Sequence, residues 1–119
     1  MEPAQVDQLF HAIDAMDPDA FVAFLTPTGT FKFGNAPPVH GRAEVRALVH
    51  GFWQSIHGSA HRRLHVWRDG DAVAVHGEVT YTRQDARQVT VPFVNVFKMD
   101  GAHIAEYLIH IDNTPLFAP

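Results

Sequence analysis

Residues 42–68 read RAEVRALVHGFWQSIHGSAHRRLHVWR, and the spacing of the apolar residues changes within this stretch. Up to Ile56 the apolar residues recur every three or four positions, which is the spacing of one helix face, and Gly58 follows as a helix-ending residue. From Ser59 onward polar and apolar residues alternate, as in a strand with one buried face. The stretch therefore predicts a helix that leads directly into a sheet.

Two helices are expected before this stretch. Apolar residues at three- and four-residue steps predict the first over residues 3–16. Asp17-Pro18-Asp19 then has the order of an N-cap, a first-turn proline and an acid that suits the helix dipole, so a short second helix is expected to continue through Leu25. Thr26-Pro27 should stop it. A short strand around residues 30–33 and a loop over 34–38 complete this half.

Four long strands are expected after the third helix, at about 60–68, 72–83, 88–99 and 103–112. Turn signals separate them at 69–71, 84–87 and 100–101, so consecutive strands should form antiparallel hairpins. One sheet face must lie under the helices. The sequence thus predicts one α+β domain over residues 1–119, with three N-terminal helices packed on a curved antiparallel sheet.

Composition excludes several classes of function. The chain has 119 residues, a formal net charge of −4 and no cysteine, which excludes disulfides and thiolate chemistry. The nine Lys and Arg residues are scattered, so no nucleic-acid partner is expected. No apolar run approaches the ~20 residues of a membrane span, and the first residues are acidic and polar, so no membrane partner and a cytoplasmic location are expected.

The order of these elements resembles the NTF2-like superfamily, in particular its SnoaL-like and ketosteroid-isomerase-like branches. The likeness rests on the Asp17-Pro18-Asp19 junction, the strand at 30–33, His40-Gly41-Arg42 before the third helix, Asp100-Gly101 and the segment 111–116, and it covers nearly the whole chain. The resemblance implies a cone-shaped, cystatin-like fold with an apolar pocket for a small hydrophobic molecule between the helices and the sheet. It also implies a homodimer through the outer sheet face.

Two branches of the superfamily require residues that this chain lacks. Steroid isomerisation uses a tyrosine and two aspartates, and their places fall at or near Leu9, Phe33 and Pro92, which are apolar. The limonene-epoxide-hydrolase branch needs Arg-x-Asp inside a central strand and an aspartate in the last one. The only such triplet, 83–85, lies at a predicted hairpin tip, and the last strand has Ile109 instead.

SnoaL-like polyketide cyclases use a histidine and an aspartate near the final strands, and His110 and Asp112 are the nearest analogues here. They are the catalytic candidates. Each has a structural alternative: Asp112 precedes Asn113-Thr114-Pro115 and has the sequence context of a turn former, and His110 suits a sheet face or an interface.

The strand faces indicate which side chains meet the pocket. Asn95 is the one amide in an otherwise apolar row, which suggests the pocket floor or, alternatively, a satisfied buried amide. Tyr81 and Tyr107 are either core aromatics or hydroxyls that point into the pocket. A single bulge would reverse which face lines the pocket. The predicted ligand-binding set is Asn95, Tyr81, Tyr107, Phe33, Phe52, Phe93, Leu9 and Ile13.

The nine histidines suggest either a metal site or an interface. His57, His61 and His65 follow at four-residue spacing, but that spacing ligates a metal only on a helix, and the alternation from Ser59 favours a strand on which the three share a face. No metal or cofactor is therefore expected. Five histidines fall on the predicted sheet, and if several of them lie in a dimer interface, the dimer is expected to dissociate or lose stability as the pH falls through the region near ~6.5.

Two functional hypotheses follow. The first is an enzyme that acts without a cofactor, by general acid–base chemistry of the cyclase, isomerase or hydrolase type, on a small hydrophobic molecule. The second is a non-catalytic binding or dimerising domain whose pocket is filled by its own side chains.

Overall fold

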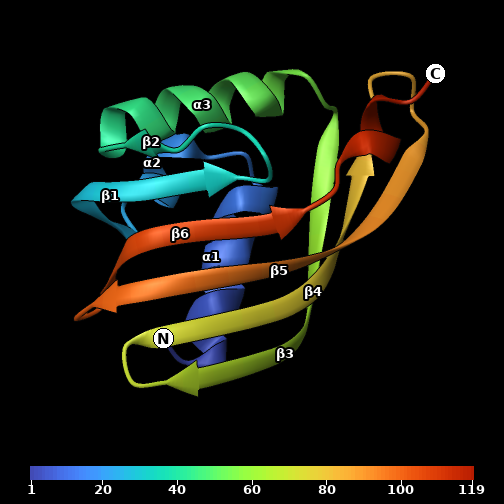
Figure 1. The fold of residues 1–119 in the computed structure, drawn as a ribbon. Helices are drawn as coiled ribbons and strands as arrows, with labels where there is room; N and C mark the ends of the chain where they lie inside the picture. The colour runs from blue at the N-terminus through green and yellow to red at the C-terminus, as the bar shows by residue number, and fades with distance from the viewer.

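The computed structural model describes all 119 residues and places three helices against one face of a six-stranded sheet (Figure 1). The helices are α1 (Pro3–Asp14), α2 (Pro18–Val22) and α3 (Arg42–Gln54). The strands are β1 (Leu25–Phe33), β2 (Val39–His40), β3 (Gly58–Asp69), β4 (Ala72–Thr82), β5 (Gln88–Asp100) and β6 (His103–Ile111), and a 3₁₀ helix, η1 (Thr114–Phe117), follows. The predicted α+β class is confirmed.

The strands lie in the order β2-β1-β6-β5-β4-β3. The four long strands pair antiparallel with their sequence neighbours, as predicted. One pairing departs from a fully antiparallel sheet, because β1 runs parallel to β6. No hairpin joins these two strands, so no turn constrains their relative direction.

The segment after α2 is more extended than predicted. Asp17 caps α2 by accepting a hydrogen bond from the Ala20 amide at 3.1 Å, but the helix ends at Val22 and Leu25 already belongs to β1. Leu25 is fully buried and pairs with Ile104. Pro27 has no amide hydrogen to give to the sheet, and it falls where the pairing with β6 shifts register. The strand therefore has nine residues rather than the four predicted.

The loop before α3 ends in a strand that the sequence analysis did not predict. Residues 39–40 form β2, which pairs with β1 at Thr30 and Phe31. His40 was expected in a loop, but its Nδ1 lies 3.0 Å from the Thr30 hydroxyl. This bond stabilises a strand too short to show any alternation.

Two bulges decide which side chains face the helices. Between Arg63 and His65 the pairing of β3 with β4 shifts, so His61 points inward and His65 points to the outer face. The expectation that these histidines share a strand face is therefore wrong. A second shift, after Lys98, turns Ile104 toward the helices, where it is fully buried.

Side-chain contacts attach α3 and α1 to the sheet. Arg42, at the start of α3, donates two hydrogen bonds to the Leu25 carbonyl, at 2.6 and 3.1 Å. Arg63 on β3 pairs with Asp7 on α1 at 2.7 Å, and this bond lowers the pKa of the Asp7 carboxyl. No helix is long and apolar enough to cross a membrane.

Candidate functional site

A cavity lies between the inner face of the sheet and the helices. Fifteen residues line it, of which twelve are hydrophobic. About 40 Å³ is open to the centre of a water molecule, which is room for a few waters. The lining residues are Ile13, Phe21, Phe31, Phe33, Val49, Phe52, Trp53, Ser59, His61, Tyr81, Phe93, Asn95, Tyr107, Ile109 and Ile111.

His61 is the lining residue with a chemically organised environment. Its Nδ1 lies 2.6 Å from Asp14 Oδ1, and its backbone amide donates to Asp14 Oδ2 at 2.8 Å. The Ser59 hydroxyl donates to the same carboxylate at 3.0 Å. Because an ionised carboxylate only accepts hydrogen bonds, Nδ1 must carry the hydrogen, which leaves the lone pair on Nε2.

Aromatic rings hold the imidazole on its remaining sides. The His61 ring stacks on Phe10 at a centroid distance of 4.9 Å and meets the Phe93 ring nearly edge-on at 5.5 Å. The His61 side chain is 14% exposed and that of Asp14 is 25% exposed. Asp14 therefore fixes the orientation of the His61 ring. The nitrogen left without a hydrogen-bond partner is Nε2 of a residue that lines the cavity.

Asn95 provides the amide of the cavity. It lies on β5 between Val75 on β4 and Ile109 on β6, and only 2% of its surface is exposed. Its Oδ1 has no hydrogen-bond partner. Buried amide oxygens are nearly always paired in proteins, so an unpaired one on a cavity wall indicates a partner that arrives from the cavity.

The two tyrosines lie at different depths. The Tyr81 hydroxyl accepts a hydrogen bond of 3.4 Å from Asn113, and burial raises the pKa of Tyr81 to about 12. Tyr107 is more deeply buried, against Phe97 and Phe31, and burial raises the pKa of its phenol further. Both hydroxyls stay protonated at neutral pH and can only donate or accept neutral hydrogen bonds.

The structure gathers most of the predicted ligand-binding set in the cavity. Asn95, Tyr81, Tyr107, Phe33, Phe52, Phe93 and Ile13 all line it. Leu9 does not, because its side chain is fully buried in the core beside the cavity.

The two predicted catalytic residues do not reach the cavity. His110 is exposed on the outer face of β6, where it pairs with Val94. Asp112 is exposed just after β6 and accepts a hydrogen bond of 2.9 Å from the Thr114 amide. Hydrogen bonds from the side chain and backbone of Thr114 lower the pKa of Asp112. This geometry is that of the turn former, the structural alternative raised for this residue.

The sequence does not single out Asp14, and it presents His61 only as one of three histidines at four-residue spacing. No motif joins the two, because 47 positions separate them. The available signal was an acidic residue at the end of an apolar helix face, together with a histidine two positions after Ser59 in an alternating segment. No group of three or more potential ligands is close enough to hold a metal ion.

Three helices over a curved six-stranded sheet form an α+β fold of the NTF2-like, cystatin-like kind. Within that class the chain belongs to the SnoaL-like domain family, whose profile matches residues 6–107. No curated protein sequence matches the chain.

Solved structures share the fold at low sequence identity. An NTF2-like protein of unknown function from Burkholderia pseudomallei superimposes with a TM-score of 0.85 at 19% identity, covering 95% of this chain and 92% of that one. A hypothetical protein with a ketosteroid isomerase-like fold from Catenulispora acidiphila, in complex with trimethylamine, gives 0.84 at 16%, covering 92% and 86%. An LEH-like epoxide hydrolase from M. tuberculosis gives 0.77 at 18%, covering 92% and 80%.

Proposed function

We propose that the chain is an enzyme that moves a proton on a small, uncharged, hydrophobic molecule. The observation that carries this proposal is the Asp14–His61 pair on the wall of an apolar cavity. His61 is the general base and then the general acid, Asp14 orients it, and Asn95 binds an oxygen or a hydroxyl of the substrate. This chemistry uses only side chains of the chain itself.

The proposed mechanism follows from the tautomer of His61. Nε2 removes a proton from a carbon or hydroxyl group of the substrate, and the Asp14 carboxylate stabilises the imidazolium that forms. The Asn95 Nδ2 group donates a hydrogen bond to the oxygen on which negative charge develops, and its unpaired Oδ1 accepts one from a hydroxyl of the substrate. The imidazolium returns the proton to another position, so the protein ends as it began. Isomerisations, cyclisations and hydrolyses all use such a proton transfer.

The charge of the lining supports an uncharged substrate. No Lys, Arg, Asp or Glu is among the lining residues, and His61 is already paired with Asp14. An anionic substrate would lose its hydration without gaining a cationic partner, at a cost of several kcal/mol.

The proposal is tested with nitrobenzisoxazole, a small neutral aromatic. When a base removes its ring C–H proton, the N–O bond breaks and a nitrile with a coloured phenolate forms, so turnover is measured by absorbance. We expect His61→Gln to lower kcat/KM at least a hundredfold, because the amide cannot accept the proton. Asp14→Asn should lower it at least tenfold, because the imidazole loses its fixed tautomer.

His11→Gln is the matched control, since His11 lies exposed on the same helix as Asp14 and outside the cavity. Its kcat/KM should equal that of the unmodified protein. Nitrogen-resolved NMR of the His61 ring should show the hydrogen on Nδ1. Turnover that survives His61→Gln would exclude this residue as the base.

A second proposal concerns the outer sheet face, meaning the face turned away from the helices. The rings of His65, Trp67 and His76 form a cluster, with His65 at centroid distances of 5.3 Å from Trp67 and 5.7 Å from His76, and Trp67 at 6.4 Å from His76. Trp67 is 55% exposed. We infer that two copies of the chain pair through this face. If the unmodified protein does not turn over nitrobenzisoxazole, assembly and ligand binding without catalysis become the function.

A further inference from the structure

A second hollow lies outside the cavity and shares its wall. This outer groove, of about 780 Å³, runs between the loop after β1 and the last residues of the chain. Phe33, Phe52 and Ile111 line both the groove and the cavity. The two spaces are therefore neighbours, and these three side chains lie between them.

The partition between the two spaces is made of aromatic rings. Phe33 and Phe52 meet edge to face at a centroid distance of 4.8 Å, and both are only partly buried. Partly buried rings change rotamer more easily than core rings, because fewer atoms pack against them. A rotation of Phe52 would join the cavity and the groove into one channel.

Phe117 stands exposed at the rim of the outer groove. Its side chain is 64% exposed, and Trp67 is the only other large hydrophobic residue so exposed. The neighbouring Leu116 is buried, with 4% exposed, so η1 is anchored while Phe117 faces outward. Phe117 thus adds an exposed apolar ring to a groove in which seven of the thirteen lining residues are hydrophobic.

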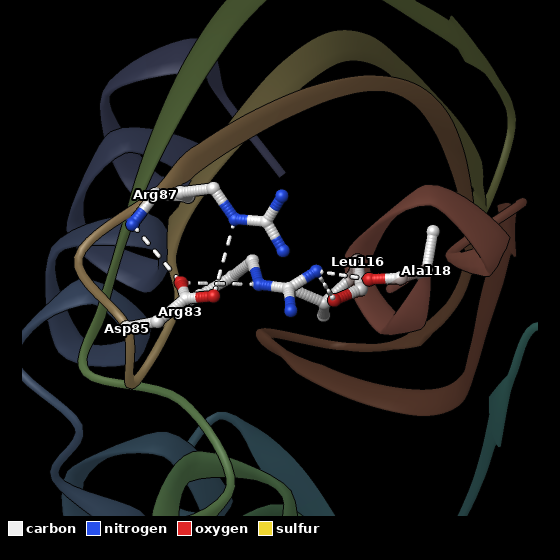
Figure 2. A network of polar contacts seen from close by, with 5 residues as sticks. All are labelled: Arg83, Asp85, Arg87, Leu116 and Ala118. Carbon is white, nitrogen blue, oxygen red and sulfur yellow. Dashed lines mark hydrogen bonds and ion pairs between the residues drawn. The ribbon is translucent and has the colours of Figure 1, made fainter.

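Arg83 fixes this segment from the β4–β5 hairpin (Figure 2). Its Nη1 donates to the carbonyl oxygens of Leu116 at 3.2 Å and Ala118 at 2.5 Å, the two residues that flank Phe117. Asp85 lies 3.3 Å from Arg83 Nε and also pairs with Arg87. The backbone on both sides of Phe117 is thus held, and the ring keeps its place at the rim.

We propose that the outer groove is a second subsite, and that the substrate is an elongated uncharged molecule with a polar head and an apolar tail. The head lies in the cavity against His61 and Asn95, and the tail passes Phe52 and lies along the groove under Phe117. This inference rests on the proposed function for the head. The volume of the cavity, about 40 Å³, is far below the roughly 300–1,000 Å³ of sites that enclose a whole ligand. A ligand of that size must therefore extend beyond the cavity.

The experiment measures how affinity depends on tail length. Phenol and a series of para-alkylphenols are titrated into the protein by calorimetry, so that the head is constant and the tail grows by one methylene at a time. We expect the affinity to rise about two- to fourfold per methylene, fourfold being the limit for complete burial. An affinity that does not rise with tail length overturns the proposal.

Variants separate the tail from the head. Phe117→Ser should reduce the rise in affinity per methylene by at least half and leave the affinity for phenol unchanged. Arg83→Gln should have the same two effects, because it releases the segment around Phe117. His61→Gln should weaken phenol and keep the gain per methylene. If His61→Gln changes neither the affinity for phenol nor the rise in affinity per methylene, His61 does not bind the head, and the proposed function is wrong as well.

Trp67→Ser is the matched control, because it removes the other exposed large hydrophobic residue, on the outer sheet face. It should leave both phenol affinity and the gain per methylene unchanged. A Phe117→Ser protein that keeps the full gain but sediments differently would assign Phe117 to a contact between proteins and overturn the subsite.

Discussion

Asp14 occupies a position that helix electrostatics disfavours. It is the last residue of α1, where the partial negative charge of the helix dipole repels a carboxylate. Three hydrogen bonds from Ser59 and His61 offset this repulsion. A residue kept at an electrostatic cost, and bonded chiefly to one cavity-lining histidine, is suited to orienting that histidine.

Asn95 allows stability and function to be separated at one residue. Asn95→Leu keeps the branch at Cγ and removes the unpaired Oδ1, so the free energy of unfolding should rise by about 1 kcal/mol. The same change should weaken phenol binding, because the head loses its hydrogen-bond partner. Urea unfolding and calorimetry measure the two effects.

A different pair of results would contradict this assignment. If Asn95→Leu unfolds more easily and binds phenol as before, the amide serves the fold through a partner such as a bound water. Val75→Ala, at the neighbouring position on β4, is the control for general damage to this part of the sheet. It should lower stability without a specific loss of binding.

The sequence could supply the cavity lining but not the catalytic pair. The predicted lining residues follow from alternation, because every second residue of a strand shares a face. The contact between Asp14 and His61 depends instead on how α1 docks on β3, which no local pattern encodes. His110 and Asp112 were chosen from a family resemblance, and in this chain their strand positions face outward or form a turn.

At the scale of the element, β4 carries a glycine where the sheet is most crowded. A Cβ on Gly77 would contact the Arg62 carbonyl oxygen and lie 2.7 Å from Phe93 Cζ. The Phe93 ring thus lies over Gly77, opposite the bulge in β3, and from there it contacts His61. The missing side chain on β4 gives this ring its place.

Gly77→Ala should destabilise the protein by about 1–3 kcal/mol, because the added methyl group overpacks the inner face. It should also lower turnover of nitrobenzisoxazole, since Phe93 must move and His61 loses a neighbour. Gly51→Ala is the control: Gly51 lies in α3 with nothing within 4 Å of an added Cβ. It should stabilise the helix by up to about 1 kcal/mol. Equal melting temperatures for the two variants would contradict this account.

The sequence predicted the long elements well because their periodicity is strong. It underestimated β1 because Pro27 and Gly29 interrupt the pattern, and it missed β2 because two residues show no period. Leu25 and residues 30–33 pair with β6, which holds the segment between them extended, and that strand lies at the other end of the chain. Long-range pairing of this kind overrides local propensity.

At the scale of the molecule, the outer sheet face has two adjacent rows of side chains. Trp67, Ala74, Val96 and Leu108 lie side by side across β3 to β6 and form an apolar row. His65, His76, Val94 and His110 form the next row. His61 does not join them, so only some of the sheet histidines lie where an interface was expected.

We expect these rows to meet their copies in a two-fold dimer at micromolar concentration. Trp67→Ser should shift sedimentation towards the monomer, because it removes the largest apolar side chain of the face, whereas Phe117→Ser should not. A protein that stays monomeric at neutral pH would contradict the dimer.

The parallel pairing of β1 with β6 has a consequence for how the protein is made. β1 is synthesised early, yet Thr30 and Phe31 find their partners only at Glu106 and Tyr107. Until the ribosome has produced β6, one edge of β1 has no strand to pair with. The other edge pairs only with the two residues of β2. Pairing of β1 with β6 is therefore a late step of folding. A nascent chain that pauses before β6 exposes the unpaired backbone groups of β1, which can pair with a strand of another chain.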